Sequence, residues 1–297
     1  MRLPMFSKNT LPIPKLVLVA TAAFGLILSG CSSVAYTSTR RAAHAIAPTW
    51  FGFVKISDHV YVNQAMPQPE RVKVLKAVSA AKARVARFFG RRLSHPKILV
   101  CSTERCFVPN REGPTPKGLE YGISAVLVSP HGLNVTILSH ELTHAELHDR
   151  VGLLRTLQSI PHWFDEGLAV LVSRDSRYSR AAWCRATDGG RRAPTLQDID
   201  RVIYHEPWLL GYGTARARVG AWYARVGRTG LDRLIREVRN GTDFHSAFNA
   251  IARTNVWRLQ LCPTSDASGP AASSQDVPAK AAAFRPTQMQ LSLSSTK

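Results

Sequence analysis

Three histidines and two glutamates stand within ten positions at residues 139–148, SHELTHAELH. His140 and His144 are four residues apart, so on a helix both imidazoles lie on one face and can bind the same ion. Glu141, next to the first histidine, can reach a water molecule on that ion. His148 lies about 12 Å along the helix axis from His140, which is too far to share one ion. We therefore expect His148 outside the ligand set, either beside the ligands or on the surface.

The residues around this motif predict the helix that it needs. Asn134 is a suitable N-cap residue. Apolar residues then recur at helical spacing, namely Val135, Leu138, Leu142 and Ala145. This stripe predicts a helix with one buried face and with both histidines of the motif beside that face.

Two histidines leave a catalytic zinc ion one protein ligand short of the usual three. A third ligand on an extension of the motif would need a glycine and a bend about three residues after His144, and Leu147 stands there. The other solution is a glutamate on a second helix. Residues 161–173, PHWFDEGLAVLVS, predict that helix, with Pro161 in the first turn and Glu166 at 22 positions after His144.

Two neighbours of Glu166 admit more than one interpretation. Asp165 is an acidic residue in a first helical turn, which an ordinary interaction with the helix dipole explains. A hydrogen bond from a ligand histidine to Asp165 is the alternative. His162, one turn before Glu166, is equally ambiguous.

Together the two motifs resemble those of the gluzincin zinc metallopeptidases, in particular the bacterial peptidase-MA-like group. The second helix of that group carries Trp-x-x-Glu-Gly-x-Ala, which here is WFDEGLA at residues 163–169. The resemblance is sharp over residues 139–173, and a looser similarity extends over residues 209–248. It implies one Zn²⁺ per chain with His140, His144 and Glu166 as ligands and Glu141 as the catalytic base.

The resemblance also implies an activity, the hydrolysis of bonds in a peptide or protein substrate. Three protein ligands leave zinc an open position for water, from which Glu141 would take a proton and later deliver it to the leaving amine. This family typically adds a Tyr or His that stabilises the oxyanion, and we name Tyr212 ahead of Tyr223 and His205. A non-catalytic zinc- or partner-binding envelope lipoprotein stays open as the alternative.

The N-terminus predicts export. Residues 1–30 carry three cations and no acid, and their apolar run at 16–27 is too short to span a bilayer comfortably. The run closes on LSGC at residues 28–31, which is similar to the lipobox of bacterial lipoproteins. That similarity implies cleavage before Cys31 and acylation of this residue. Because Ser32 follows, it also implies a lipid anchor in the bacterial outer membrane, facing the periplasm.

Export places the four remaining cysteines in an oxidising compartment, where they can pair in three ways. We favour a short loop closed by Cys101 and Cys106, with Cys184 joined to Cys262 across the chain. A cysteine-based zinc site is the alternative, but no Cys-x-x-Cys spacing supports it.

The chain is strongly basic, with a formal net charge of +19, or +16 once the three signal-peptide cations are removed. For an envelope protein this charge favours anionic lipid headgroups or cell-wall polymers, and we expect no nucleic-acid partner. The cations concentrate in residues 70–90, an expected helix that ends at Gly90 and whose basic face we interpret as solvated surface. Its apolar stripe is Val74, Val78, Ala81, Val85 and Phe88.

The predicted fold class is α+β. Residues 51–63 predict a strand or hairpin, residues 96–103 and 122–130 predict further strands, and long segments after Asn134 predict helices. We expect a small mixed sheet lobe packed on an active-site helix pair, with a C-terminal helical lobe. The strand at 122–130 is expected at the sheet edge, lining the cleft, where an extended peptide could pair with it.

The predicted organisation along the chain has four parts. A lipoprotein signal peptide at residues 1–30 is followed by a tether at residues 31–47. Residues 48–262 form the zinc metallopeptidase-like domain. Residues 263–297 are rich in Ser, Ala, Pro and Gln, which predicts a disordered tail.

Overall fold

The computed structural model describes residues 43–107, 117–205 and 207–253 together with Cys262. These residues belong to the same structural unit, which ends at Cys262. The predicted signal peptide, the cysteine predicted to be acylated, most of the predicted tether and the predicted tail lie outside the described residues.

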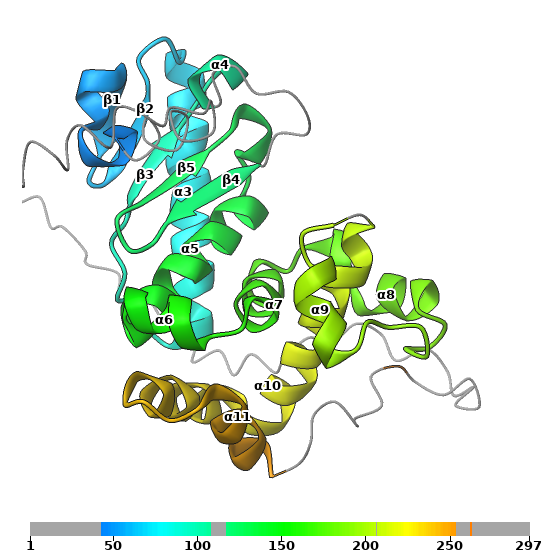
Figure 1. The fold of residues 1–297 in the computed structure, drawn as a ribbon. Coiled ribbons are helices and arrows are strands. Elements are labelled where there is room, and N and C mark those ends of the chain that lie inside the picture. Colours follow the sequence, from blue (N-terminus) through cyan, green and yellow to red (C-terminus); the bar gives the residue numbers. More distant parts are fainter. Residues whose placement is uncertain (1–42, 108–116, 206, 254–261, 263–297) are drawn as a thin grey trace, which may run out of the picture. The chain divides into compact units, whose positions relative to one another are not determined.

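In the described part of the chain, five strands form one mixed sheet with the order β1-β2-β3-β5-β4 (Figure 1). β1 (Phe53–Ser57) and β2 (Val60–Asn63) form an antiparallel hairpin, as the sequence predicts. β3 (Lys97–Val100) and β5 (Ala125–Val128) continue the sheet in parallel, and β4 (Gly118–Tyr121) pairs antiparallel with β5. The fold is therefore α+β with a small mixed sheet, as predicted.

The sequence predicts the segment at 122–130 at the edge of the sheet, and this prediction is wrong. β5 lies between β3 and β4, and all four of its residues are buried. β4, a segment that the sequence analysis does not predict as a strand, occupies the edge instead, and its residues are partly exposed. The sequence AVLV offers no polar side chain to solvent, so it favours the interior of the sheet, whereas GLEY tolerates an open edge.

One face of the sheet is covered by helices. α3 (Gln68–Phe89) connects the parallel strands β2 and β3 and packs against α5 (Val135–Val151). The predicted helix at 70–90 is confirmed, and Gly90 follows its last turn with a φ of 83°. Phe89, and not Phe88, completes the buried stripe, while the Phe88 ring stacks on Tyr223.

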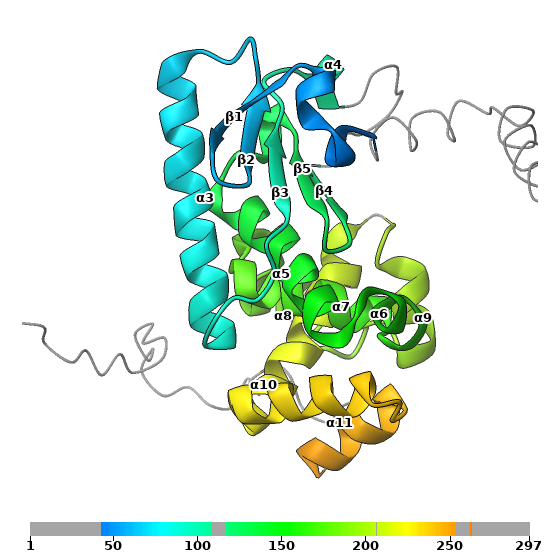
Figure 2. The same cartoon turned by 90° about the vertical axis from the view of Figure 1, so that its left-hand side faces the viewer.

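The opposite face of the sheet is covered by residues 43–51 and by α4 (Glu104–Phe107), so in Figure 2 the sheet lies between α3 and the dark blue residues 43–51. Residues 43–47, which the sequence places in the tether, pack onto this face, with His44 and Ala45 buried. The apolar cluster beneath them includes Phe53, Leu99, Phe107 and Leu127.

Two packed helices, α5 and α7 (His162–Ser173), are connected by α6 (Leu153–Ser159); α5 contacts the sheet and α7 contacts α10 (Trp208–Arg239). The predicted N-cap of α5 is confirmed, because the Oδ1 atom of Asn134 accepts a hydrogen bond from the backbone N–H of Ile137 at 2.9 Å. Pro161 immediately precedes α7, which also agrees with the prediction.

A buried carboxylate fixes α5 to the connection between α3 and β3. Glu146 is fully buried and accepts hydrogen bonds from the backbone N–H groups of Leu93 and Ser94 and from the Ser94 hydroxyl, at 2.8–3.0 Å. The guanidinium of Arg150, one turn later, donates to the same carboxylate at 2.8 Å. Glu146 therefore has a structural role, and its partners satisfy its charge.

The C-terminal part of the described chain is helical, as predicted, and its longest helix packs along α7. A non-helical Gly227, with a φ of 62°, kinks that helix. Among the described helices, none combines the length and the apolar character that crossing a bilayer requires. The remaining elements are η1 (Pro48–Phe51), η2 (Pro130–Gly132), η3 (Ser176–Tyr178), α8 (Arg180–Ala186), α9 (Leu196–Val202), α10 (Trp208–Arg239) and α11 (Phe244–Ala252).

Both predicted disulfides are present. Cys101 is bonded to Cys106 on α4, and Cys184 on α8 is bonded to Cys262. The second disulfide encloses 78 positions of the chain, whereas the first encloses only 5.

Removing the long-range disulfide is expected to destabilise the protein more than removing the short one. On the loop-entropy model, replacing Cys184 and Cys262 by Ser lowers the free energy of unfolding by about 4 kcal/mol, and the same change at Cys101 and Cys106 lowers it by about 2 kcal/mol. Denaturant titrations of the two double variants measure the difference. An equal loss in both would contradict this expectation.

Candidate functional site

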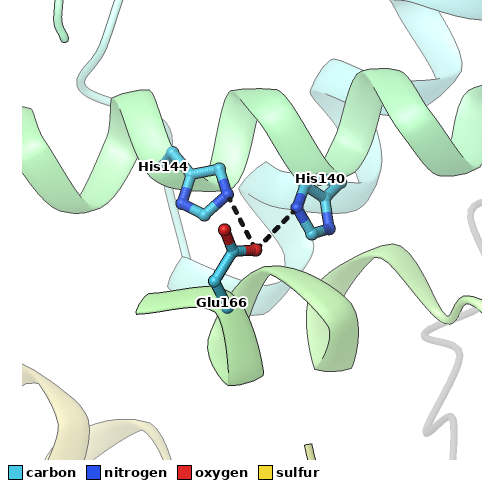
Figure 3. Close-up of side chains that lie close together, drawn as sticks. All are labelled: His140, His144 and Glu166. Carbon is cyan, nitrogen blue, oxygen red and sulfur yellow. Dashed lines mark hydrogen bonds and ion pairs between the residues drawn. The ribbon is translucent and has the colours of Figure 1, made fainter. Parts of the chain in front are cut away.

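His140 and His144 on α5 meet Glu166 on α7 (Figure 3). The Glu166 Oε2 atom lies 3.1 Å from His140 Nε2 and 3.6 Å from His144 Nε2. One possible ligand atom from each residue lies within 4.8 Å of the other two. All three side chains are largely buried, at 10–16% exposure. The group could therefore hold a metal ion.

The donor types suit several divalent metal ions, and zinc is one of them. Ligand atoms at 2.0–2.1 Å from a tetrahedral ion lie about 3.4 Å from one another. The two distances from the Glu166 oxygen, 3.1 and 3.6 Å, lie on either side of that value, and the three ligand atoms lie within 4.8 Å of one another. Two imidazole nitrogens and one carboxylate oxygen form a ligand set that Zn²⁺ accepts, with one position left for water.

Asp165 orients one of these imidazoles. Its Oδ1 atom lies 2.6 Å from His144 Nδ1, so the other ring nitrogen of His144 is turned toward Glu166. Asp165 lies in the first turn of α7, as the helix-dipole interpretation requires, and its carboxylate also makes the alternative contact, a hydrogen bond with a candidate ligand. A carboxylate that holds the distal nitrogen of a histidine fixes the ring and raises its basicity as a ligand.

His148 extends this hydrogen-bonded chain to the sheet. It is buried, and its Nε2 atom lies 3.3 Å from Asp165 Oδ2. Its Nδ1 atom lies 3.1 Å from an Oε1 atom of Glu120 on β4. The connection therefore runs from the edge strand through His148 and Asp165 to His144. The three histidines are spaced four residues apart, which indicates that they share one helix face. This spacing does not indicate that carboxylates from other elements lie between them.

The charges of this cluster compensate one another. Burial opposes the charge on His144, but Asp165 and Glu166 outweigh it and raise its pKa well above the usual value. Burial is similarly overcome at His148, where hydrogen bonds to Asp165 and Glu120 raise the pKa to about 9. Despite burial, the imidazoles lower the pKa of Glu166 to about 2 and that of Asp165 well below its usual range. The carboxylates are therefore charged at neutral pH.

Glu141 has a different environment from the candidate ligands. It is buried, and burial raises the pKa of its carboxyl group, which the neighbouring His140 and His144 only partly oppose. A raised pKa is typical of a group that accepts and returns a proton near neutral pH. The backbone of Gly118 on β4 lies directly against it, because a Cβ atom at Gly118 would be 2.6 Å from Glu141 Oε1.

A cavity of about 500 Å³ opens onto these side chains. The edge strand, α6, the turn after α9 and the start of α10 form its other walls, and no lysine or arginine is among its described lining residues. It thus differs in charge from a chain that carries 39 Lys and Arg residues against 20 Asp and Glu residues. Its walls outside α5 and α7 are Gly118, Leu119, Glu120, Thr156, Leu157, Ile160, Tyr204, Trp208 and Tyr212.

Two tyrosines face this cavity. Tyr212, the predicted oxyanion donor, lines it with its ring centroid 6.4 Å from that of His140. Tyr204, which sequence analysis missed, lines it too. Burial and the charge of Glu166 raise the pKa of both phenols, so both keep the proton they would donate. Tyr204 carries no local sequence signal, because it lies in a turn after α9.

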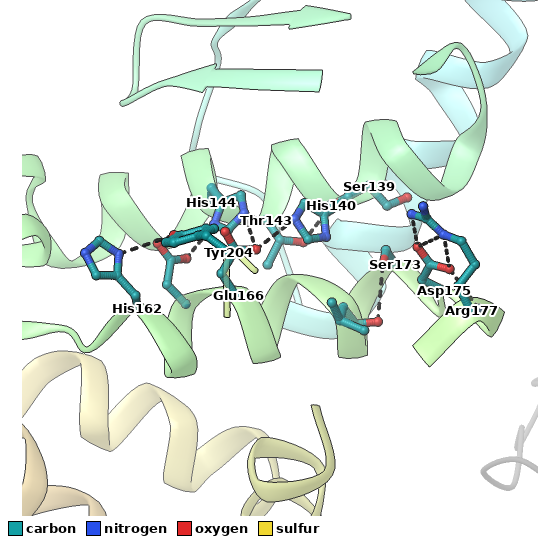
Figure 4. Close-up of polar contacts among 12 residues, drawn as sticks. Ser139, His140, Thr143, His144, His162, Glu166, Ser173, Asp175, Arg177 and Tyr204 are labelled. Atoms are coloured by element: carbon teal, nitrogen blue, oxygen red, sulfur yellow. Dashed lines mark hydrogen bonds and ion pairs between the residues drawn. The ribbon is translucent and has the colours of Figure 1, made fainter. Parts of the chain in front are cut away.

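The other two predicted oxyanion donors lie elsewhere. Tyr223 stacks on Phe88 with the ring centroids 4.5 Å apart, and neither it nor the exposed His205 lines the cavity. His162 does line it, and its Nδ1 atom lies 3.4 Å from the Tyr204 hydroxyl (Figure 4). Tyr212 and Tyr204 are therefore the tyrosines that the cavity offers as donors.

Comparison with models of known protein families finds no match for this chain. A search of curated proteins finds no match either.

Asp165→Asn should weaken metal binding although it removes no ligand. The asparagine cannot reproduce the charged hydrogen bond that orients His144, and losses of such supporting carboxylates weaken metal affinity by about 10–100-fold. Zinc titration against a competing chelator measures the change. Asp198→Asn on the surface of α9 is the matched control and should bind as the wild type does. Equal affinity of Asp165→Asn and wild type would contradict the orienting role.

Proposed function

We propose that this chain is a zinc-dependent metallopeptidase of the gluzincin type, which hydrolyses peptide bonds in a peptide or protein substrate. The observation that carries the proposal is the position of Glu166. It lies on a second helix within 3.6 Å of both histidines of the His-Glu-x-x-His motif, and Glu141 faces the same cavity. His140, His144 and Glu166 would hold the metal.

Zinc bound by these three side chains would lower the pKa of a water molecule toward neutrality and stabilise negative charge on the substrate carbonyl oxygen. Glu141 accepts a proton from the attacking water and returns it to the leaving amine, for which its raised pKa is suited. Tyr212, or Tyr204, which also lines the cavity, donates its phenol proton in a hydrogen bond to the developing oxyanion.

The chain of hydrogen bonds behind the ligands supports this arrangement. Asp165 holds His144, and His148 connects Asp165 to Glu120 on the edge strand. These groups do not have to touch a substrate. They keep the imidazole of His144 turned toward the metal position, which limits the reorganisation that the reaction requires.

The proposal includes the place of action. The lipobox-like sequence before Cys31 would place the enzyme in the bacterial envelope, anchored to the outer membrane and facing the periplasm. The two disulfides agree with an oxidising compartment. The basic exterior suits anionic lipid or cell-wall polymers, and no nucleic-acid partner is proposed.

The two glutamates of the site are expected to respond differently to substitution. Glu166→Ala removes a ligand and should reduce zinc binding, whereas Glu141→Gln keeps every ligand and removes only the proton acceptor. Glu141→Gln should therefore hold near-stoichiometric zinc and lose activity on the order of 10²–10⁴-fold. Metal analysis and a peptide-library cleavage assay on the purified proteins measure both effects.

Glu237→Gln on the surface of α10 serves as the control and should retain both zinc and activity. Wild-type zinc affinity in Glu166→Ala would refute the proposed ligand set. If the wild type binds zinc and cleaves no peptide in the library, and Glu141→Gln fully complements a deletion strain, a non-catalytic binding protein replaces the peptidase.

Gly118→Ala tests the position of Glu141 without altering its chemistry. Gly118 does not have a positive φ, so alanine fits the backbone, but its Cβ atom would meet the Glu141 carboxylate at 2.6 Å. We expect the flexible carboxylate to move, zinc to remain bound, and kcat to fall on the order of 10²-fold.

The matched control for this variant is Gly220→Ala on α10, where the new Cβ atom would make an ordinary 3.7 Å contact with Leu171. Steady-state kinetics and zinc content are measured for both proteins. An unchanged kcat in Gly118→Ala would show that the position of Glu141 against β4 is unimportant.

A further inference from the structure

The first described segment of the chain is held firmly against the sheet. The ammonium group of Lys97 on β3 donates hydrogen bonds to the carbonyl oxygens of Ala45 at 3.0 Å and Ile46 at 2.8 Å. Within this segment, residues 43–51, the side chains of His44, Ala45 and Pro48 are buried. The outward side chains of residues 43–51 are therefore presented by a fixed backbone.

Those outward side chains are large and apolar. Trp50 is 86% exposed, Ile46 is 76% exposed and Phe51 is 36% exposed, within a span of six residues. We call these three residues the N-terminal apolar patch. Tryptophan is normally well buried on average, so this degree of exposure calls for a partner. A tryptophan ring with its polar N–H is favoured at a membrane–water interface.

The patch lies where the chain leaves the described structure toward Cys31. Eleven residues, 32–42, separate that cysteine from the first described residue. A chain of this length reaches at most about 40 Å when fully extended, and its average span when flexible is about 20 Å. If Cys31 is acylated, the patch is therefore confined close to a bilayer at high effective concentration.

The sequence around the patch has the charge that suits an anionic membrane surface. Arg40 and Arg41 are separated from the described segment by Ala42 alone in the sequence, and the chain as a whole is strongly cationic. Cations in the chain that leads to an exposed aromatic residue add electrostatic attraction to the insertion of the ring among lipid headgroups. The exposed aromatic ring and the positive charge both favour contact with an anionic membrane surface.

We propose that the N-terminal apolar patch inserts into the headgroup region of an anionic phospholipid bilayer. It would form a second membrane contact next to the lipid anchor and hold the domain against the surface. Neither the metal site nor hydrolysis enters this inference. The segment that carries the patch, residues 43–51, lies on the face of the sheet opposite to α3 (Figure 2).

The test uses the chain from residue 31 to 297 with Cys31→Ala, so that no acyl group contributes. Sedimentation with vesicles containing phosphatidylglycerol should show binding, weaker on phosphatidylcholine alone. The double variant Ile46→Ser with Trp50→Ser should bind at least about tenfold more weakly, because two large apolar side chains no longer enter the interface. Unchanged thermal unfolding shows that both proteins are folded.

The matched control is Val72→Ser with Leu154→Ser, two exposed apolar residues on α3 and α6, which should bind vesicles as the parent does. Three results would overturn the proposal: no vesicle binding by the parent, equal binding by the Trp50 variant, or cross-links from position 50 in cells that join only to protein. Zinc content and peptidase activity are measured on the same proteins, so failure of the peptidase proposal is seen separately.

Discussion

The candidate site depends on how closely α7 packs between α5 and α10. Glu166 extends from α7 toward α5, and the next residue, Gly167, lies against α10, where a Cβ atom would be only 2.6 Å from the backbone oxygen of Ala215. A side chain at Gly167 would force α7 and α10 apart. The glycine therefore sets the position of α7, and through it the distance from the Glu166 carboxylate to His140 and His144.

Buried carboxylates occur in two different environments along α5 and α7. Glu146 has backbone N–H groups, a hydroxyl and a guanidinium as partners, an arrangement that stabilises a connection between elements. Glu141, only five residues earlier, has a carboxyl group whose pKa is raised by burial, beside imidazoles that are shared with other acids. Burying several acids and histidines together is costly unless each has a partner. Such a cluster in an open cavity is more typical of a functional site than of a stabilising one.

The edge of the sheet contributes to the same cavity. β4 brings the backbone of Gly118 against Glu141 and the carboxylate of Glu120 against His148, so the strand contacts both the proposed base and the support of a proposed ligand. The apolar strand β5 lies behind it and takes the interior position. Because β4 and not β5 forms the edge of the sheet, residues of β4 form this wall of the cavity.

Local patterns in the sequence determined much of this protein. The N-cap at Asn134, the helix that ends before Gly90, the β1–β2 hairpin and both disulfides follow from spacing, capping and composition, because these depend on residues close in the chain or on few pairings. The spacing of His140 and His144 likewise places them one turn apart on any helix. Only the tertiary structure decided that β4 forms the edge, that Asp165 holds His144, that His148 reaches Glu120 and that Tyr204 faces the cavity. The two hydrogen bonds join residues 21 and 28 positions apart in the sequence. The packing of α5, α7 and the sheet sets their distances, and local periodicity has no influence on that packing.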